Sequence, residues 1–444
     1  MVRKLALKCL VQLENRNSQI SPVIDDVIRN NRLSEVDQRL LTEIVYGTIR
    51  WRGHLDWIIQ QFTKPSFQFD LQMSSILRIG VYQLLYLDRV PNHAAINETV
   101  KLANQKGQKS KNFVNAILRA IQRSTDSLIT PTLEVDPISH ISLKLSYPKW
   151  LVKKWIGQFS LKWALEFCHA SNQTAPLSVR ANTLRIDRHE LAMSLRKDGN
   201  EVVESHISPE GLLLTKTKPI RSLKEFQAGL FQVQDEAAQL VAHLLAPQEK
   251  SKIVDLCASP GGKTTHLAQL VGNVTNIVAV DLSKNKTERI QENCQRLGIT
   301  NIDTQVANAK TDQIEALAAA DLILIDAPCS GTGTLRRHPD IRWKRTAKQI
   351  LNLANLQFEI LLKVAIQIKS GAVIVYSTCS TEVEENQEVI TRFLEACPRF
   401  SIEPARDYLP FLPTNAITSD GYLQVFPHTH GVDGTFAVRL RKID

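Results

Sequence analysis

Two cysteines of this sequence stand directly after apolar runs, in the motifs DAPCSGTG, which starts at Asp326, and STCS, which starts at Ser377. The first motif brings together a carboxylate, the thiol of Cys329 and a flexible loop, and the second adds the thiol of Cys379. One cysteine on a strand is usually a small buried hydrophobe. Two thiols beside a carboxylate at one edge of a sheet instead suit a catalytic site with a sulfur nucleophile.

A third motif, CASPGGK over Cys257–Lys263, indicates a nucleoside-binding loop. Its consecutive glycines, Gly261 and Gly262, let the backbone turn tightly and approach a ligand closely. Asp281 ends the next apolar run, where a carboxylate can accept hydrogen bonds from both ribose hydroxyls. The motif is neither GxGxxG nor GxxxxGK[ST], which disfavours a nicotinamide-dependent oxidoreductase and a P-loop. A plain glycine turn with a solvated aspartate is the alternative for these residues alone.

The elements that would hold these motifs alternate in type from about residue 250. Short apolar runs predict strands, and the stretches between them predict helices. The predicted strands are Ile253–Cys257, Ile277–Val280, Asp303–Val306, Leu322–Ile325 and Ala372–Tyr376, and the predicted helices are Lys284–Leu297, Thr346–Lys369 and Val383–Ala396. This alternation predicts a doubly wound, mostly parallel sheet that gathers the motifs at the carboxyl ends of its strands. The last runs, Tyr422–Phe426 and Phe436–Leu440, predict an antiparallel hairpin.

The earlier part of the chain has a different pattern. Residues 1–130 predict an all-helical domain, with Ser34 and Asp37 in a capping-box pattern before one helix. The polar segment Ser124–Pro137, which carries two prolines, predicts a linker. Residues 138–245 predict a small α+β domain, and residues 246–444 the third domain. A length of 444 residues suits this division.

Composition narrows the classes of function. No apolar run approaches the ~18 residues of a membrane span, and no cleavage site follows the N-terminal segment, so we expect neither a membrane nor a secreted protein. The seven cysteines are scattered singly, which is typical of reduced thiols in a cytoplasm and predicts no metal site. Residues 1–150 hold 20 Lys and Arg against 13 Asp and Glu, whereas the rest of the chain holds 34 against 32. The basic first third indicates a nucleic-acid partner.

The order CASPGGK, Asp281, DAPCSGTG and STCS resembles that of the S-adenosylmethionine-dependent RNA cytosine-C5 methyltransferases, most closely the Sun/Fmu group that acts on 16S ribosomal RNA. The likeness covers the whole chain, because the helical domain is similar to the RNA-binding antitermination factor NusB and the segments RANT and QDEA of the middle region also match. It implies a multidomain fold: an all-α N-terminal RNA-binding domain, a small α+β middle domain and a C-terminal α/β Rossmann-like methyltransferase domain with a mostly parallel sheet.

The resemblance also implies a role for each site residue. S-adenosyl-L-methionine would be the cofactor, with Asp281 on its ribose and Asp326 near the cofactor and the target base. Asn308 stands where the family usually has an acidic residue near the adenine, so we expect weaker or retuned binding. Cys379 would be the nucleophile and Cys329 would assist product release, an order that the sequence alone does not give. The loop around the methionine part would comprise Cys257, Ala258, Ser259, Pro260, Gly261, Gly262 and Lys263.

The two thiols suit this chemistry because C5 of cytosine is a poor nucleophile. A thiolate that adds to C6 converts the ring into an enamine-like species whose C5 can attack a methyl group. A carboxyl group near N3, here that of Asp326, would neutralise the charge that develops on the ring.

A basic segment after the Cys329 motif predicts RNA contacts beside the reaction centre. An aromatic residue among cations suits phosphate binding and base stacking. The residues are Arg336, Arg337, Arg342, Trp343, Lys344 and Arg345. A solvated loop that leads into the next helix is the alternative. Arg50-Trp-Arg52 and Lys101–Lys111 are further candidates in the helical domain.

The sequence therefore predicts a cytoplasmic, monomeric enzyme that methylates C5 of a cytosine in small-subunit ribosomal RNA. The same reaction on transfer RNA and a non-catalytic NusB-like RNA-binding factor are the alternatives. Methylation of the adenine amino group is disfavoured, because Asp-Ala-Pro-Cys stands where such enzymes have Asp or Asn followed by two prolines and an aromatic residue.

Overall fold

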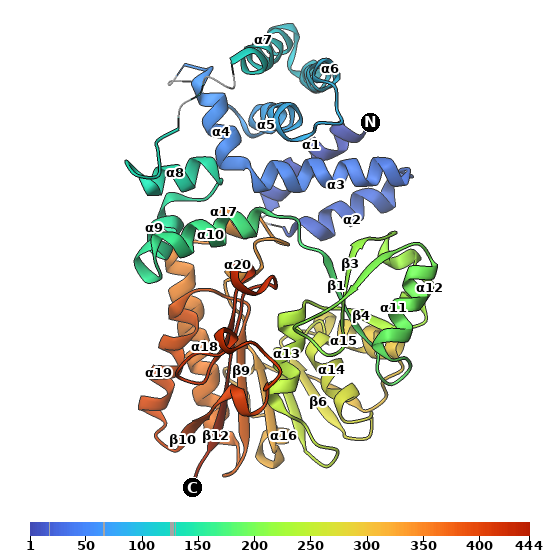
Figure 1. Ribbon diagram of the computed structural model, residues 1–444, viewed down its shortest axis with the longest axis vertical. Coiled ribbons are helices and arrows are strands. Elements are labelled where there is room, and N and C mark those ends of the chain that lie inside the picture. The colour runs from blue at the N-terminus through green and yellow to red at the C-terminus, as the bar shows by residue number, and fades with distance from the viewer. Residues whose placement is uncertain (17, 65–66, 125–127, 129) are drawn as a thin grey trace. The chain divides into compact units, whose positions relative to one another are not determined.

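The computed structural model describes residues 1–16, 18–64, 67–124, 128 and 130–444, which form two compact units (Figure 1). The first unit comprises Met1–Gln173 and Leu335–Lys344, and the second comprises Thr174–Thr334 and Arg345–Asp444. The chain thus leaves the second unit for ten residues and then returns to it. The predicted linker Ser124–Pro137 lies partly outside the described residues.

The first unit is helical, as the sequence predicts for its first 130 residues. In α3, for example, apolar residues at helical spacing are buried, and Ser34 caps the helix by accepting a hydrogen bond from the N–H of Asp37 at 3.2 Å. The elements of this part are α1 (Val2–Arg16), α2 (Ile20–Asn30), α3 (Glu35–Arg50), α4 (Arg52–Gln61), α5 (Leu71–Tyr86), α6 (Asn92–Leu102), η1 (Ala103–Lys106) and α7 (Gln108–Ser124).

Three further helices also belong to the first unit: α8 (Pro137–Lys144), α9 (Lys149–Gln158) and α10 (Leu161–Asn172). The sequence analysis placed them in the middle domain, so the structure divides the chain later than expected. They pack around their own aromatic cluster, in which the rings of Trp155 and Phe167 meet edge-on with centroids 4.9 Å apart. The apolar periodicity predicts such a helix but does not say which neighbour its buried face meets.

The segment Leu335–Lys344, which ends in α17 (Ile341–Lys344), packs inside the first unit. Arg342 is fully buried; its guanidinium lies 3.9 Å from the ring centroid of Tyr147 and donates to Oδ1 of Asn172 at 2.8 Å. A cation held in this way is not available to a phosphate. The prediction that Arg342 contacts RNA is therefore wrong.

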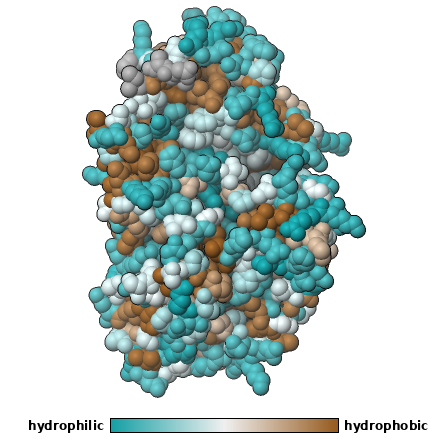
Figure 2. Space-filling view, in the orientation of Figure 1, coloured by the Kyte–Doolittle hydropathy of each residue, from teal (hydrophilic) through white to brown (hydrophobic). Residues whose placement is uncertain are grey.

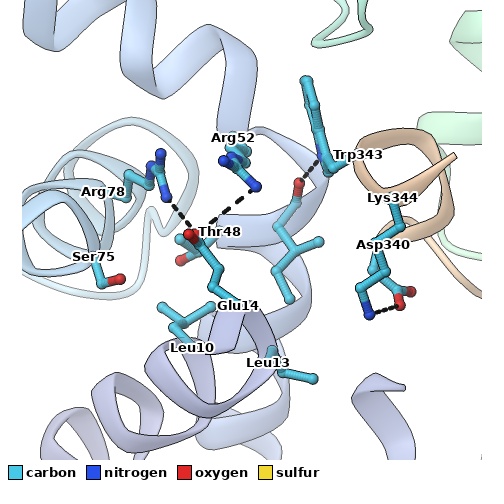
Figure 3. Close-up of a pocket in the computed structure, with 11 residues that line it drawn as sticks. Leu10, Leu13, Glu14, Thr48, Arg52, Ser75, Arg78, Asp340, Trp343 and Lys344 are labelled. Atoms are coloured by element: carbon cyan, nitrogen blue, oxygen red, sulfur yellow. Dashed lines mark hydrogen bonds and ion pairs between the residues drawn. The ribbon is translucent and has the colours of Figure 1, made fainter. Parts of the chain in front are cut away.

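Trp343 and Lys344 are also bound within the first unit (Figure 3). The indole N–H of Trp343 donates to the carbonyl of Ile49 at 2.8 Å, and the ammonium of Lys344 pairs with Asp340 at 2.9 Å and donates to the carbonyl of Ser18. These contacts stabilise the fold of the first unit. The expected exposed basic surface is instead a packed segment that completes the helical unit.

The second unit begins with a small antiparallel sheet in the order β2-β3-β1-β4. Its strands are short, and β2 carries two charged residues among its four. Its elements are β1 (Leu177–Ala181), α11 (Arg188–Lys197), β2 (Glu201–Glu204), β3 (Gly211–Lys216), η3 (Ile220–Ser222), α12 (Lys224–Gln227) and β4 (Phe231–Val233). This arrangement confirms a small α+β region, although it begins after the predicted boundary.

The large sheet has the order β10-β12-β9-β8-β5-β6-β7, with β11 paired to β12. Strands β9, β8, β5, β6 and β7 are parallel, and β12 runs antiparallel between β9 and β10. The strands are β5 (Ile253–Leu256), β6 (Ile277–Asp281), β7 (Ile302–Val306), β8 (Leu322–Asp326), β9 (Val373–Thr378), β10 (Phe400–Glu403), β11 (Leu423–Val425) and β12 (Thr435–Lys442). The mostly parallel sheet and the final antiparallel hairpin are confirmed, whereas β10 was not predicted.

Helices cover the large sheet and supply two buried clusters on its faces. They are α13 (Glu236–Leu245), α14 (Gly262–Leu270), α15 (Lys284–Leu297), α16 (Glu315–Ala319), α18 (Ala347–Gln367), α19 (Gln387–Ala396) and α20 (Pro427–His430), with short turns η4 (Thr332–Thr334), η5 (Val383–Glu385), η6 (Ala405–Asp407) and η7 (Thr414–Ala416). Because β5, β6, β8 and β9 are parallel neighbours, their carboxyl ends and the motifs that follow them share one edge.

Among the described residues, α18 alone has the length and hydropathy of a membrane span. It connects β8 to β9, and residues such as Ile360, Leu361 and Val364 pack into the core beside the sheet. Its apolar composition is thus that of a crossover helix. On the face of the molecule seen in Figure 2, hydrophobic residues lie in small groups among hydrophilic ones.

The packed segment gives a first prediction. Trp343→Ala should lower the free energy of unfolding by about 2–3 kcal/mol, because it removes indole packing and the hydrogen bond to Ile49. Thermal unfolding followed by circular dichroism should show the lower midpoint. Lys348→Ala, at an exposed position just beyond the segment, should change it little. An unchanged midpoint together with weakened RNA binding would favour the stacking role that the sequence suggests.

Candidate active site

The CASPGGK motif forms the turn between β5 and α14, as the sequence predicts. Gly261 has a φ of +92°, and a Cβ placed there would lie 3.1 Å from Cγ2 of Ile290. A side chain at this position would therefore be strained and crowded, which explains the glycine. Gly262 then begins α14, so the loop ends at a helix N-terminus whose free N–H groups favour a polar ligand.

Asp281 ends β6 with its carboxylate buried and fixed by three donors. The N–H groups of Ser259 and Leu282 donate to it at 2.9 and 2.6 Å, and the ammonium of Lys286 lies 2.9 Å away. A carboxylate held by the glycine-rich loop and by its own strand end has a fixed direction. It can accept hydrogen bonds from a diol without prior reorganisation.

A cavity of about 250 Å³ lies beside this carboxylate, lined by residues at and after the carboxyl ends of β5, β6, β7 and β8 and by α18. Cys257, Asp281, Asn308 and Pro328 are among its lining residues. The structure thus brings together predicted residues from three separate motifs. Burial raises the pKa of Cys257 to about 12, so its thiol is neutral and serves as part of the wall.

The two motif cysteines meet at the same edge. In the β8–β9 register Asp326 lies opposite Ser377, whose hydroxyl donates to Oδ1 of Asp326 at 3.0 Å. Three residues beyond Asp326 and two beyond Ser377, the Sγ atoms of Cys329 and Cys379 are 3.3 Å apart. The predicted convergence of two thiols and one carboxylate is therefore present.

A close backbone contact sets the distance between the two cysteine loops. The N–H of Gly333 donates to the carbonyl of Cys379 at 2.9 Å, and the N–H of Gly434 donates to the carbonyl of Gly333 at 2.8 Å. A Cβ on Gly333 would lie 2.1 Å from the carbonyl oxygen of Gly434. Glycine is required here because the carbonyl oxygens of Gly434 and Cys379 both lie where a Cβ of residue 333 would be.

The charges around the two thiols differ in sign. The ammonium of Lys263 pairs with Oδ2 of Asp326 at 2.6 Å; burial opposes its charge, but Asp326 outweighs burial and raises the pKa of Lys263, with a smaller contribution from Cys379. On the other side, the hydrogen bond with Cys379 and burial raise the pKa of Cys329 well above its usual value, and the charge of Glu385 adds to this. Cys329 thus keeps its proton more firmly than an ordinary cysteine.

Glu385 is a buried residue that the sequence analysis did not identify. Its carboxylate accepts from the N–H of Ser330 at 2.8 Å and from the hydroxyls of Ser330 and Ser380, the residues that directly follow the two cysteines. Gln357 donates both to Glu385 and to the carbonyl of Pro328. Burial raises the pKa of Glu385, while the two serines lower it. One carboxylate therefore joins both cysteine loops.

The remaining predicted residues occupy different places. Arg345 donates to the carbonyl of Ser330 at 2.9 Å and so anchors the start of α18 on the Cys329 loop. Arg336 is buried, and its carbonyl accepts a hydrogen bond from Arg50 at 2.9 Å within the first unit. Arg337 is half-buried. Of the six cations and aromatics predicted to face RNA, Arg337 and Arg345 remain candidates.

Comparison with known proteins agrees with this geometry. The model of the 16S rRNA methyltransferase RsmB/F family matches residues 242–441, that of the NusB family residues 1–123, and that of the RsmF/B-like ferredoxin-like domain residues 147–221. The probable ribosomal RNA small subunit methyltransferase B of Bacillus subtilis (strain 168) is 35% identical over 447 residues, covering 99% of this chain and 98% of the relative. The chain belongs to the RsmB/F family.

Other relatives extend the match over the whole chain. The protein of the same name from Synechocystis sp. (strain ATCC 27184 / PCC 6803 / Kazusa) is 36% identical over 444 residues, covering 99% of each chain. The crystal structure of PH0851 is similar with a TM-score of 0.83 and 26% identity, covering 100% of this chain and 99% of that one. These matches confirm the resemblance to the Sun/Fmu group and to NusB, and they identify the large-sheet domain as the methyltransferase domain of an RsmB/F protein.

The position of Glu385 gives a second prediction. Glu385→Gln should lower the rate constant of methyl transfer about 10- to 100-fold, because a small shift of either cysteine loop misplaces a thiol. The dissociation constant for the methyl donor should stay within about twofold, since Glu385 is not among the residues that line the cavity. Single-turnover kinetics and calorimetry separate the two effects. Glu388→Gln, the same change at an exposed position, is the control. Equal rates of methyl transfer in the two variants would show that Glu385 does not position the cysteine loops.

Proposed function

We propose that the chain transfers a methyl group from S-adenosyl-L-methionine to C5 of a cytosine in 16S ribosomal RNA, through a covalent adduct between Cys379 and C6. The observation that carries the proposal is the pair of thiols 3.3 Å apart, one of them next in sequence to Pro328, which lines the cavity beside Asp281. A methyltransferase acting on a more nucleophilic atom has no need of two cysteines at this edge.

The cavity suits the nucleoside part of the proposed cofactor. Asp281 offers a fixed carboxylate to the two ribose hydroxyls, and the amide oxygen of Asn308 can accept from the adenine amino group. That oxygen now accepts the N–H of Lys310 at 3.1 Å, and it has a second lone pair to offer. The residues Ala258, Ser259, Pro260, Gly261, Gly262 and Lys263 would hold the methionine part. Bound there, the cofactor supplies an electrophilic methyl group.

Cys379 is the better candidate for the nucleophile. A thiolate attacks more readily than a thiol, and the charged groups named beside the two cysteines differ in sign. The cation of Lys263 interacts with Cys379, whereas Cys329 experiences the carboxylate of Glu385 and holds its proton. Cys329 can then donate a hydrogen bond to the Sγ of Cys379, which supports the negative charge there.

The protein groups would act in a fixed order. The thiolate of Cys379 would form a bond to C6, the electron pair of the C5–C6 double bond would move into the ring, and a proton from the Lys263–Asp326 pair would neutralise the charge at N3. C5 would then bond to the methyl carbon, and the electron pair of the broken bond would stay on the sulfur of the cofactor. Transfer of the C5 proton to solvent would return its electron pair to the C5–C6 bond, the N3 proton would go back to the Lys263–Asp326 pair, and the C6–sulfur bond would break to release Cys379. Cys329, in contact with the leaving sulfur, assists this last step by offering it a proton.

The names of the relatives support ribosomal over transfer RNA as the substrate, since those from Bacillus subtilis and Synechocystis are called small subunit methyltransferases. The NusB-like unit and its excess of basic residues support an RNA contact by the first unit. Lys109, exposed at the start of α7, and Lys111, half-buried two residues later, are candidates for phosphate contacts. We further propose that the enzyme acts as a monomer in the cytoplasm, whose reducing conditions keep both thiols free.

A third prediction separates the roles of the two thiols. Cys379→Ala should form no covalent RNA adduct and transfer no methyl group, because it lacks the nucleophile. Cys329→Ala should attack and methylate but release its product slowly, so that an adduct accumulates. A denaturing gel with labelled 16S RNA and cofactor shows the adduct, and mass spectrometry of nucleosides identifies 5-methylcytosine. Cys397→Ala, a half-buried cysteine outside both motifs, should behave like the unchanged chain.

The possible outcomes of that gel are distinct. An adduct from Cys379→Ala and none from Cys329→Ala would show that Cys329 is the nucleophile and that Cys379 assists product release. Adducts from neither variant, with methylation retained by Cys379→Ala, would exclude covalent catalysis. A methylated base other than 5-methylcytosine would contradict the proposed atom.

A fourth prediction concerns Asn308. Asn308→Asp should lower the dissociation constant for S-adenosyl-L-methionine about fivefold, because a hydrogen bond to a charged acceptor is worth about 1 kcal/mol more than one to a neutral acceptor. Asn308→Ala, which removes the acceptor, should raise it. Calorimetry measures all three constants. Equal values for Asn, Asp and Ala would show that this position does not contact the adenine amino group.

A further inference from the structure

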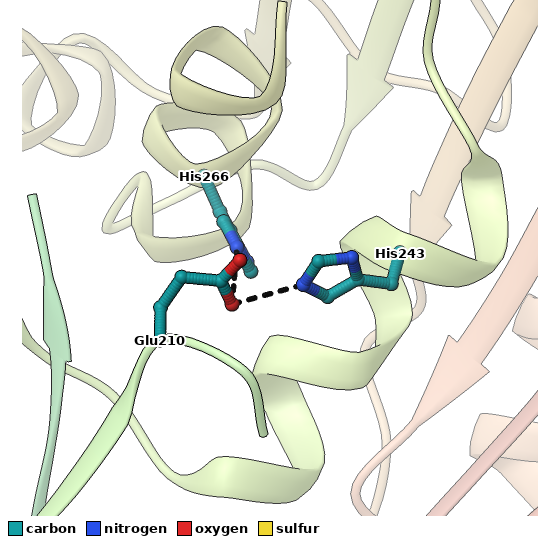
Figure 4. Close-up of side chains that lie close together, drawn as sticks. All are labelled: Glu210, His243 and His266. Carbon is teal, nitrogen blue, oxygen red and sulfur yellow. Dashed lines mark hydrogen bonds and ion pairs between the residues drawn. The ribbon is translucent and has the colours of Figure 1, made fainter. Parts of the chain in front are cut away.

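Three potential metal ligands converge in the second unit, outside the candidate active site (Figure 4). Glu210 lies in the turn before β3, His243 on α13 and His266 on α14. Nε2 of His243 lies 2.9 Å from Oε2 of Glu210, and Nε2 of His266 lies 3.6 Å from the same oxygen. Two donor atoms that each lie about 2.0–2.2 Å from one tetrahedral zinc ion are ~3.4 Å apart. The two distances in this cluster lie on either side of that value, as expected for side chains that could share one ion.

His266 is the unusual member of the cluster. Its side chain is completely buried, and among the described residues neither ring nitrogen has a hydrogen-bond partner. Leaving a buried polar group unpaired costs about 1–3 kcal/mol, so such groups generally have a ligand, a water or an ion.

We propose that Glu210, His243 and His266 bind one divalent transition-metal ion, with zinc as the expected occupant. Two imidazoles and one carboxylate are a donor set that zinc accepts, with a water as the fourth ligand. The side chains of Glu210 and His243 are 13% and 17% exposed, so solvent reaches one side of the cluster. The ion would replace the direct bond between Glu210 and His243 and would give His266 a ligand bond in place of its long contact with Glu210.

One neighbouring charge opposes the ion. Arg180 is buried and acts electrostatically on His266, but its guanidinium is bound elsewhere: it donates to the carbonyl of Gly262 at 2.6 Å, to the hydroxyl of Thr265 at 3.1 Å and to the amide oxygen of Gln234. The carboxylate of Glu210 offsets this charge. We therefore expect a site of moderate affinity that needs both histidines.

The ion would serve the fold and not the reaction. None of the three ligands lines the cavity beside Asp281. They instead connect the small sheet, through Glu210, to α13 and to α14, the helix that begins at Gly262 of the glycine-rich loop. The site is independent of the proposed function, and it would fix the helix from which that loop extends.

The test measures metal binding directly, in full-length chain without a histidine tag. All variants carry Cys379→Ala, because the thiol pair could itself take zinc. After incubation with zinc and dialysis against metal-free buffer, elemental analysis should find one zinc per chain. Glu210→Gln and His243→Gln should each reduce the retained zinc about tenfold or more. His189→Gln removes a histidine from an exposed His189–Glu204 pair and should retain the full amount.

A spectroscopic measurement needs no substitution in the cluster. Cobalt(II) bound at this site should give the intense visible absorption of four- or five-coordinate cobalt, without the thiolate charge-transfer bands of a cysteine site. Zinc should also raise the midpoint of thermal unfolding, and less so in His243→Gln. The proposal is overturned by a chain that retains no zinc, by equal retention in Glu210→Gln and His189→Gln, or by a cobalt spectrum like that of the free hydrated ion.

Discussion

The contact between the two cysteine loops is the constraint on which the rest of the active site depends. Parallel pairing of β8 and β9 brings the loops to one edge, but both cysteines lie beyond the last paired residues, where strand pairing alone leaves the backbone freedom to move. That freedom is removed by the Gly333–Cys379 hydrogen bond and by the buried carboxylate of Glu385, which binds the residue after each cysteine. A carboxylate in this position costs desolvation, which several hydrogen bonds offset. These contacts hold the two Sγ atoms 3.3 Å apart, and even a small shift of either backbone would change that distance.

The same arrangement makes two chemically identical side chains unequal. Lys263 on one side and Glu385 on the other divide the pair electrostatically. Lys263 also belongs to the glycine-rich loop and pairs with Asp326. One ammonium therefore connects the glycine-rich loop with Asp326 at the end of β8 and interacts with Cys379.

The sequence predicts the parts of the molecule whose signals are local. The five parallel strands, the turn at Gly261 and the gathering of Asp281, Asp326, Cys329 and Cys379 follow from apolar runs, from glycine and from the rule that parallel strands end at one edge. Glu385 could not be found in this way, because TEVEEN contains three glutamates, two of them buried, and only tertiary packing decides which one joins the cysteine loops. The prediction that the basic segment contacts RNA is wrong for Arg342 for a related reason. Arg342 and Trp343 are residue types common in RNA contacts, but Arg342 packs on the ring of Tyr147, which is distant in sequence and could not be identified as its partner.

That segment changes how the domains of the chain are to be understood. A helical domain and a methyltransferase domain joined by one linker could each fold alone, and the match of the NusB family to residues 1–123 suggests such a division. Yet Leu335–Lys344 belongs to the first unit although it lies between the Cys329 motif and α18. Without it, Tyr147 loses the cation over its ring, and the carbonyls of Ser146 and Ile49 lose their donors Arg342 and Trp343. The first unit is therefore complete only when the methyltransferase sequence is present. Because the segment begins two residues after Gly333, which contacts Cys379, the packing of the helical unit and the position of the Cys329 loop are tied together by the chain itself.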